Sequence, residues 1–573
     1  MALSNQSKAD NVSRKHIINQ RETLVDDALH GYVLAHPHLQ LVKEHKIVIR
    51  KDIGLIREKQ VTLITGGGAG HEPTAIGYVG AGMISAAVSG NLFASPSPRQ
   101  ILAAIRLCRS PHGTLLLVKN YTGDVLNFGL ARERAAAEGI KVAMLVVADD
   151  CAVGKERGGL VGRRGLAGAV LVHKIAGALA ARGAPLDAVL AMARSVVANV
   201  STIGVALEPC YVPGADESNL RQLGIHGEPG CEVVPLMPSR QLAERMLAMV
   251  TATDETDPDR AFVPWSSGQP ADDVAVLVNN LGGTSALELS SFTKDVVELV
   301  EQRGFPVKRI YSDAVITSLN TPGVSITLLR LSDARLQLEL LDAPTEATGW
   351  PHGSGYNSDA FCPADSPQDH QAQEHRGEHD TAVENIVRAA CASVIRAEPE
   401  ITRLDTITGD GDCGDTLKAG ANAILSALDA RTLPTAPLHR FALGVADLLE
   451  GSMGGTSGAL YCIFFNALAT HFATSTATDA TLWQNATTYT PARKGDRTML
   501  DALSPFVETF AQGASFAKAV DAAREGMAAT QTMRPRLGRA TYVGNAELAK
   551  VADAGAYGVV SILEGIHAAM DDQ

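Results

Sequence analysis

The sequence predicts an α/β region followed by a mainly helical region, with a polar linker between them. From Gln60 to about Leu341, short apolar runs alternate with Ala- and Leu-rich amphipathic stretches. This alternation is typical of βαβ units and mostly parallel sheets. Further on, apolar residues recur at three and four positions, which indicates helices. We therefore expect an α/β domain at 1–344, a flexible linker at 345–380 and a helical domain at 381–573.

Each element follows from its own stretch of sequence. In the first domain we expect strands in QVTLITG, TLLLVKN, KVAMLVVADD, DDVAVLVNNLGG and SITLLRL, and helices in IGYVGAGMISAAV, LNFGLARERAAAEG and AGAVLVHKIAGALAARG. In the second we expect helices in TAVENIVRAACASVIRAE, LKAGANAILSALDA, HRFALGVADLLEG and SFAKAVDAAREGMAAT. The segment between the domains is rich in Pro, Gly, Ser and His, which is linker composition.

Composition narrows the classes of function. A chain of 573 residues with a formal charge of -13 lacks the basic field that nucleic acids and anionic membranes require of a partner. The most apolar window, GALYCIFFNALATHF, contains Asn466, Thr470 and His471, so we expect a buried helix rather than a membrane span. Eight scattered cysteines and a polar N-terminus favour a reduced, cytoplasmic protein.

The stretch GGGAGHEP at 66–73 follows a predicted strand and resembles a nucleotide loop at first sight. It lacks the Lys of a Walker A loop, and its glycines do not have Rossmann spacing. Glycines at a strand end still let backbone approach a ligand closely, and His71 could move protons there. A structural turn whose His and Glu cap the next helix is the alternative. The residues alone leave both readings open.

Two further loops could complete such a site. KNYTGDVLNFG places Asp124 just after a predicted strand end, and GIHGEPG at 224–230 repeats the glycine, histidine and glutamate of the first motif. A single histidine in a loop is usually solvated. Two such loops with an acid at strand ends favour a site in the crevice where open α/β sheets bind ligands.

The helical domain contains a dense acidic turn, LDTITGDGDCGD, with Asp405, Asp410, Asp412 and Asp415. Carboxylates this close repel one another, and oxygen ligands suit magnesium or calcium. The EF-hand pattern fails, and a solvated acidic turn is the alternative. GSMGGTSG at 451–458 precedes a predicted helix, whose N–H groups suit an anion. Together these turns favour a magnesium–triphosphate site, so a kinase is the leading hypothesis.

Taken in order, the motifs resemble those of the dihydroxyacetone kinases. GGGAGHEP, NLFASPS, VKNYTGD, VLVHKIAGALA and GIHGEPG resemble the substrate-binding half, and LD, GDGDCG, MGGTSGALY, DRTMLDAL and GRATYVG resemble the nucleotide-binding half. The resemblance implies that His226 holds the ketose as a covalent hemiaminal. It also implies that His71 and Asp124 are the acid/base pair, and that Gly68 and Lys119 line the pocket.

For the second half the resemblance implies a helical barrel that binds ATP and two Mg²⁺ ions through Asp405, Asp410 and Asp412. The nucleotide contacts that it implies are Gly411, Cys413, Gly414, Gly455, Thr456, Arg497, Asp553 and Gly555. Members of this family are commonly homodimers, so a homodimer is expected here. The fused chain resembles the ATP-dependent kinases rather than the versions that use phosphoenolpyruvate.

Several positions depart from the family pattern. The segment ADESNLRQL, before GIHGEPG, is shorter than usual. Asn91 and Asp415 replace a usual acid and a usual threonine, and ADAGA replaces PDPGA around Asp553. The shortened loop predicts that the acceptor is a ketose longer than three carbons, such as D- or L-erythrulose, and dihydroxyacetone, the usual acceptor of the family, is the alternative.

Two other functions occur among relatives of this family. One is an FAD-AMP lyase that forms cyclic FMN in the helical half, and the other is a non-catalytic ketose sensor. Retention of Asp405, Asp410 and Asp412 argues against the sensor, which has no need for a metal–triphosphate site.

Overall fold

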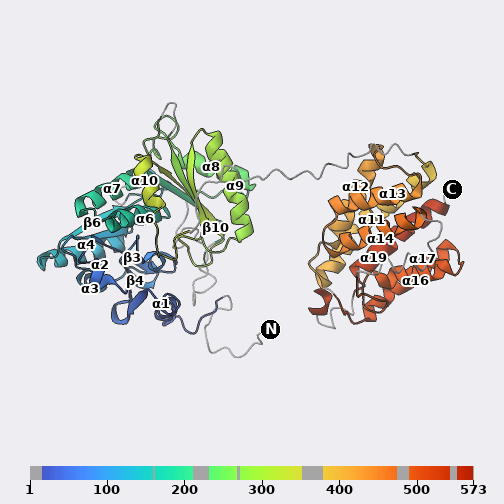
Figure 1. Cartoon of the computed structure of the whole chain (residues 1–573), viewed down its shortest axis with the longest axis horizontal. Helices are drawn as coiled ribbons and strands as arrows, with labels where there is room; N and C mark the ends of the chain where they lie inside the picture. Colours follow the sequence, from blue (N-terminus) through green and yellow to red (C-terminus); the bar gives the residue numbers. More distant parts are fainter. Residues whose placement is uncertain are drawn as a thin grey trace. The chain divides into compact units, whose positions relative to one another are not determined.

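The computed structural model describes residues 16–158, 162–208, 210, 231–266, 272–351, 378–473, 490–537, 539–542 and 551–571. The chain forms two compact units, residues 1–360 and 361–573, coloured blue to yellow and orange to red in Figure 1. Most of the expected linker, residues 352–377, lies outside the described residues.

The first unit contains a six-stranded sheet with the order β1-β2-β4-β3-β5-β6. β3, β4, β5 and β6 pair in parallel, whereas β1 and β2 add an antiparallel edge. The strands are β1 Leu39–Val42, β2 Ile47–Arg50, β3 Thr62–Ala69, β4 Ala86–Leu92, β5 Thr114–Lys119 and β6 Val142–Val147. The expected strands QVTLITG, TLLLVKN and KVAMLVVADD are therefore confirmed as β3, β5 and β6.

Helices cover both faces of this sheet, as its continuous apolar strands require. Leu63 and Leu117 pack with α6 and α7, whereas Ile64 and Leu116 pack with α3 and α4 on the opposite face. The helices are α3 Pro98–Leu107, α4 Thr122–Ala137, α6 Gly168–Ala181 and α7 Leu186–Ala198. The site residues at the ends of β3 and β5 are thus held between two packed cores.

A second sheet of four strands has the order β7-β10-β8-β9. β8 and β9 are parallel, and β10 runs antiparallel to β7 and β8. Its elements are β7 Val200–Ala206, α8 Ser239–Val250, β8 Val274–Asn280, α9 Ala286–Gln302, β9 Val307–Asp313, β10 Gly323–Arg330 and α10 Ala334–Leu341. The α/β class is confirmed, with sheets that are mixed rather than mostly parallel.

One expected helix of the first unit is wrong. IGYVGAGMISAAV forms a short 3₁₀ turn, η2 Ile76–Tyr78, and then enters strand β4. A Cβ on Gly80 would lie 2.6 Å from the backbone nitrogen of Ala347, and Gly82 has φ +72°. The segment is shaped by close backbone packing and by pairing of β4 with β3, which override its local apolar pattern.

The second unit is all-α, as expected, and its helices enclose an apolar cavity of about 530 Å³. The helices are α11 Thr381–Thr408, α12 Cys413–Asp429, α13 Leu438–Ser452, α14 Gly455–Ala473, α16 Leu500–Ala511, α17 Phe516–Ala529 and α19 Ala554–Asp571. GALYCIFFNALATHF lies in α14, which is only partly buried: Phe472 is 43% exposed. Of the helices that the structure describes, none has the length and apolar character that a membrane crossing requires.

Candidate functional site

The glycine turn of the first unit is built around close backbone contacts. A Cβ on Gly68 would lie 2.7 Å from the nitrogen of Ala94, and Gly70 has φ +101° with its hypothetical Cβ 2.7 Å from the Phe93 ring. Side chains at these two positions would therefore clash with the segment that follows β4. The turn also holds Glu72, whose carboxylate accepts a hydrogen bond from the Gly70 nitrogen at 2.9 Å.

His71 follows this turn and is 4% exposed. Its Nδ1 lies 2.7 Å from the carbonyl oxygen of Thr317, which can only accept a hydrogen bond. Nδ1 therefore carries the proton, and in the neutral ring Nε2 has the lone pair that a general base needs. The imidazole also packs against the Phe93 ring, with 5.0 Å between the ring centroids.

Lys119 and Asp124 flank the same turn. Lys119 ends β5 and Asp124 lies in the first turn of α4, and both are buried. A Cβ placed on Gly67 would lie 3.4 Å from Lys119 Nζ and 3.5 Å from Asp124 Oδ2. Among the described residues, Asp124 Oδ1 has no hydrogen-bond partner, although the Ser95 side chain bonds the carboxyl group.

Burial shifts the protonation of this group of side chains toward neutral forms. Desolvation raises the pKa of Asp124, and the charge of Lys119 opposes that rise. Desolvation also lowers the pKa of Lys119, which Asp124 and other buried acids oppose. The pKa of Glu72 is raised for the same reason. Side chains whose pKa values are shifted toward the neutral range in this way are candidates for exchanging protons with a bound hydroxyl group.

The structure therefore places Lys119 and Asp124 beside Gly67, and it places His71 in the same glycine turn, against Thr317 and Phe93. His226 lies outside the described residues. The sequence reasoning missed Thr317 and the ring of Phe93. The NLFASPS motif could have signalled Phe93, whereas Thr317 is 246 positions from His71 and carries no motif.

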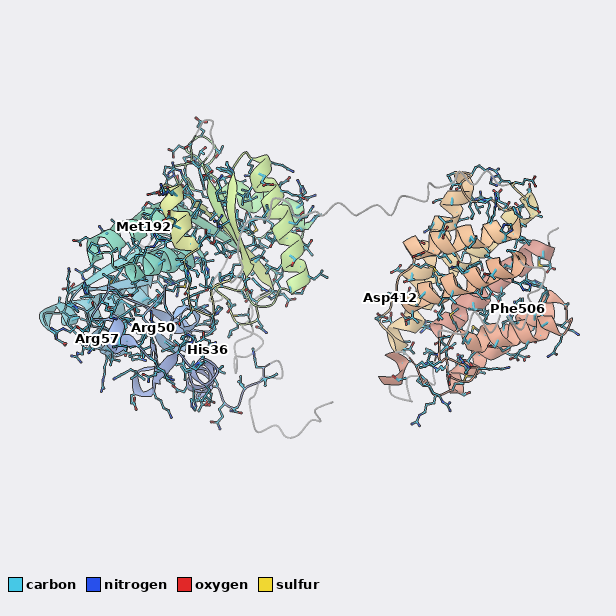
Figure 2. All side chains as sticks on the ribbon, in the orientation of Figure 1. His36, Arg50, Arg57, Met192, Asp412 and Phe506 are labelled. Carbon is cyan, nitrogen blue, oxygen red and sulfur yellow. The ribbon has the colours of Figure 1, made fainter. Side chains whose placement is uncertain are left out.

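In the second unit, Asp405, Asp410 and Asp412 each offer a carboxylate oxygen, and these oxygens lie within 4.8 Å of one another. Asp405 closes the turn between α11 and α12, since its Oδ2 accepts hydrogen bonds from the nitrogens of Gly411, Asp412 and Cys413 at 3.0–3.1 Å. Asp410 and Asp412 are exposed, and Asp412 lies at the edge of the helical unit (Figure 2). An all-oxygen set of this kind suits Mg²⁺.

The N-termini of three helices lie near this cluster. Cys413 begins α12, and its thiol hydrogen-bonds to Ser457 in the first turn of α14. Asp553 caps α19 by accepting a hydrogen bond from the Ala556 nitrogen at 2.9 Å, and its carboxylate interacts electrostatically with Asp405. Helix N-termini attract phosphate groups.

The remaining expected nucleotide contacts have different environments. Gly455 starts α14 with φ +67°, and Thr456 follows it at an exposed position. Gly414 lets α12 pack closely against α11, because a Cβ there would lie 2.6 Å from the Glu398 carbonyl oxygen. Gly555 is the second residue of α19, two positions after Asp553. Arg497 is 1% exposed and donates to the carbonyls of Thr530 and Val551 at 2.9 and 2.8 Å.

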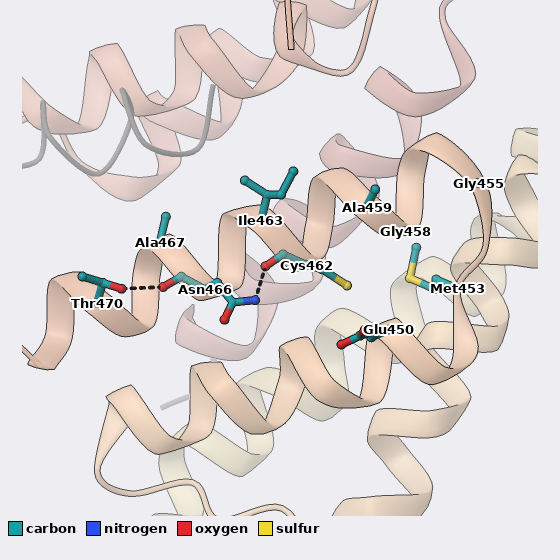
Figure 3. A pocket seen from close by; sticks show the side chains of 10 residues that line it. All are labelled: Glu450, Met453, Gly455, Gly458, Ala459, Cys462, Ile463, Asn466, Ala467 and Thr470. Carbon is teal, nitrogen blue, oxygen red and sulfur yellow. Dashed lines mark hydrogen bonds between the residues drawn. The ribbon is translucent and has the colours of Figure 1, made fainter. Parts of the chain in front are cut away.

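A pocket of about 640 Å³ continues from the Gly455 turn along α13 and α14 (Figure 3). Glu450 lies on its α13 side, and Cys462 and Asn466 line its α14 side. Asn466 donates to the Cys462 carbonyl at 2.9 Å. The pocket has room for a group the size of a nucleoside.

Two of the departures from the family pattern, Asn91 and Asp415, lie outside these groups. Asn91 is exposed and accepts a hydrogen bond from Lys46 at 3.1 Å, which places it on the surface. Asp415 is exposed in the first turn of α12 and is not one of the three clustered acids. The shortened loop ADESNLRQL lies outside the described residues.

Comparisons with known proteins agree with this two-part organisation. Residues 30–349 match the Dak1 domain and residues 407–568 match the DAK2 domain. The chain is 40% identical to dihydroxyacetone kinase 1 of Saccharomyces cerevisiae, over 95% of this chain and 98% of that protein. It is 38% identical to the triokinase/FMN cyclase of Mus musculus, over 97% and 98% of the two chains.

A solved structure resembles the whole chain. It is the dihydroxyacetone kinase from C. freundii in complex with AMP-PNP and Mg²⁺, with a TM-score of 0.62, 32% identity, and coverage of 96% of this chain and 98% of that one. Both domain matches and the full-length similarity to these kinases lead to one assignment. The protein belongs to the dihydroxyacetone kinase family.

Proposed function

We propose that this protein is an ATP-dependent kinase that phosphorylates a terminal hydroxyl of a short-chain ketose, dihydroxyacetone or a C4 ketose such as erythrulose. The observation that carries the proposal is that one chain of this family retains both a buried set of proton-transfer groups and an acidic cluster with oxygen ligands. A kinase needs the first to activate the acceptor and the second to bind a metal–nucleotide complex.

His226 would hold the ketose by covalent capture. Its neutral imidazole nitrogen would attack the carbonyl carbon, the C=O π bond would break, and the oxygen would take a proton as the imidazole loses its own. The product is a neutral hemiaminal that is fixed in one orientation, which lowers the entropic part of the barrier.

His71 and Asp124 would then act on the terminal hydroxyl. The lone pair on Nε2 of His71 follows from the Nδ1 contact with Thr317, and Asp124 has an oxygen without a partner among the described residues. Either group can accept the hydroxyl proton as the oxygen attacks phosphorus. Lys119 and the Gly68 backbone would orient the polyol.

In the second unit Asp405, Asp410 and Asp412 would hold Mg²⁺. The resemblance to the family implies two such ions. Bound magnesium would neutralise charge on the transferred phosphoryl group. The N–H groups at Gly411–Gly414 and at Gly455 and Thr456 would bind phosphate oxygens. Asp553 and Gly555 would border the nucleotide, while Arg497 supports them from within the core.

The proposal is tested by coupled assays of ADP release with dihydroxyacetone, D-erythrulose, L-erythrulose and glyceraldehyde. We expect release with a ketose, and a His226→Ala variant that still binds ATP but does not transfer phosphate. Full activity in that variant would refute covalent capture. A clear preference for dihydroxyacetone would refute the C4 assignment, which rests on the short ADESNLRQL loop.

A second activity is favoured by the similarity to a triokinase/FMN cyclase. The helical unit would cleave FAD to AMP and cyclic FMN at the same acidic cluster. Incubation with FAD and Mn²⁺ without ketose tests this, since cyclic product should form only if the lyase is present.

We further propose a cytoplasmic homodimer, for which sedimentation equilibrium should give about twice the chain mass of 60.2 kDa.

A further inference from the structure

The segment between β9 and β10 of the second sheet packs onto the loop that carries His71. The nitrogen of Leu319 donates to the carbonyl of Gly70 at 2.9 Å. The Thr74 hydroxyl donates to the carbonyl of Val315 at 2.9 Å, and the Tyr78 hydroxyl donates to the same carbonyl. The segment that carries His71 is thus joined to the other sheet by three hydrogen bonds, two to Val315 and one to Leu319.

Thr317 lies at the centre of this contact and makes three hydrogen bonds to the His71 loop. Its carbonyl accepts from His71 Nδ1 at 2.7 Å, and its nitrogen donates to the His71 carbonyl at 3.3 Å. Its hydroxyl donates to the carbonyl of Glu72 at 2.8 Å. These bonds fix the imidazole ring and the backbone on both sides of it.

The position of the Thr317 carbonyl is set in turn by Asn279 on β8, which is completely buried. Its Oδ1 accepts from the nitrogens of Val315 and Ile316 at 2.8 and 3.1 Å. Its Nδ2 donates to the Ile316 carbonyl at 2.9 Å and to the Ser325 hydroxyl at 3.1 Å. All four hydrogen-bonding positions of this amide are used, three of them on the two residues before Thr317.

We propose that Asn279 and Thr317 are positioning residues that hold His71 in the tautomer with the proton on Nδ1, so that Nε2 exchanges a proton with the acceptor hydroxyl. The proposal rests on the proposed kinase function for its role in catalysis. The tautomer itself can be measured without substrate. A carbonyl 2.7 Å from Nδ1 favours that tautomer because the alternative would place two lone pairs against each other.

The first test compares threonine variants in the full-length protein. Thr317→Val removes the bond to Glu72 and should lower kcat about 3- to 10-fold, the size expected for one lost hydrogen bond, with little change in KM. Thr317→Ser keeps the hydroxyl and should restore kcat. The matched control is Thr321→Val, because the Thr321 hydroxyl is buried in the same loop without a partner among the described residues. It should leave kcat unchanged.

The second test uses Asn279→Asp, which keeps the size of the side chain but replaces both donors by an oxygen. We expect a fall in kcat of about 10- to 100-fold and an altered acidic limb of the pH–kcat profile, while the affinity for AMP-PNP and Mg²⁺ stays at the wild-type value. In ¹⁵N spectra of histidine-labelled protein, assigned with His71→Gln, wild type should show a protonated Nδ1 and the variant a mixed population.

Three results would overturn the proposal: a wild-type kcat in Thr317→Val, equal losses in Thr317→Val and Thr321→Val, or a wild-type His71 signal with the proton on Nε2. Failure of the proposed function is a separate outcome. It would appear as a lack of ketose-dependent ADP release in wild-type protein, and the ¹⁵N spectra would still decide the tautomer.

Discussion

His71, Lys119 and Asp124 in the α/β unit are each 4–5% exposed, whereas Asp410 and Asp412 in the helical unit are exposed to solvent. His71 and the neighbouring Glu72 are hydrogen-bonded to Thr317, which lies more than 240 positions further along the chain. The acidic cluster is formed within eight residues by a single turn whose backbone N–H groups bind Asp405.

The difference follows from the chemistry that each group would perform. Proton transfer near neutral pH needs desolvation, which moves the pKa of Asp124 up and that of Lys119 down. Metal binding needs ionised carboxylates that are open to the incoming ion and its waters, which favours an exposed turn. The α/β group is therefore organised by packing, whereas the acidic cluster would be completed by a bound ion.

The largest expected effect comes from removing a carboxylate of the acidic cluster. Asp412→Asn should lower kcat about a thousandfold, because an exposed ligand is lost and metal stabilisation of charge is worth several kcal/mol. The thermal midpoint should not fall, since removal of one like charge relieves repulsion. Steady-state assays and thermal unfolding measure both quantities. The control is Asp415→Asn, which removes an acid outside the cluster and should keep the wild-type kcat. An equal loss of kcat in this variant would mean that the total negative charge of the turn matters, rather than one metal ligand.

The next effect breaks the proton-transfer side. Asp124→Asn should lower kcat about a hundredfold, because an amide of the same shape cannot take a proton. Binding of AMP-PNP with Mg²⁺ should be unchanged. Asp187→Asn is a matched control, since Asp187 is an exposed acid in the first turn of α7. Unchanged kcat in Asp124→Asn would remove Asp124 from the acid/base pair.

A stability measurement sharpens the contrast within the acidic cluster itself. Asp405→Ala should destabilise the helical unit by about 3 kcal/mol, because three backbone N–H groups lose a charged acceptor. Asp410→Ala should cost much less, since that side chain is exposed. Chemical unfolding of the full chain without metal gives both values. Equal costs would show that Asp405 does not organise the turn.

The smallest expected effect concerns the pH dependence of stability. Burial raises the pKa of Asp553 to about 6, so the folded state binds a proton more tightly than the unfolded state. The free energy of unfolding should therefore fall as pH rises from about 4 to about 6. Asp553→Asn keeps the cap on α19 and should be more stable than wild type by about 1–2 kcal/mol at pH 8. At pH 4 the two proteins should converge. A constant difference at both pH values would contradict the shift.

Much of the secondary structure and the acidic cluster could be predicted because each depends on a short, continuous stretch of sequence. The strands QVTLITG and TLLLVKN are continuous apolar runs, and the acidic turn places its three carboxylates within eight residues. The family motifs supplied the roles that we propose for the site residues, which spacing alone left open. The prediction of a helix in IGYVGAGMISAAV was wrong because contacts with the Ala347 segment and with β3 determine the structure of this stretch. Asn279 and Thr317 could not be found because their partners lie far away in sequence.

ADP release by the wild-type chain, measured with and without ketose and with and without Mg²⁺, tests the central claim most directly. We expect release only when ATP, Mg²⁺ and a ketose are all present, and its loss in both Asp124→Asn and Asp412→Asn. Release at the same rate without ketose, or retained in either variant, would contradict a kinase that combines a buried acceptor site with an exposed metal site.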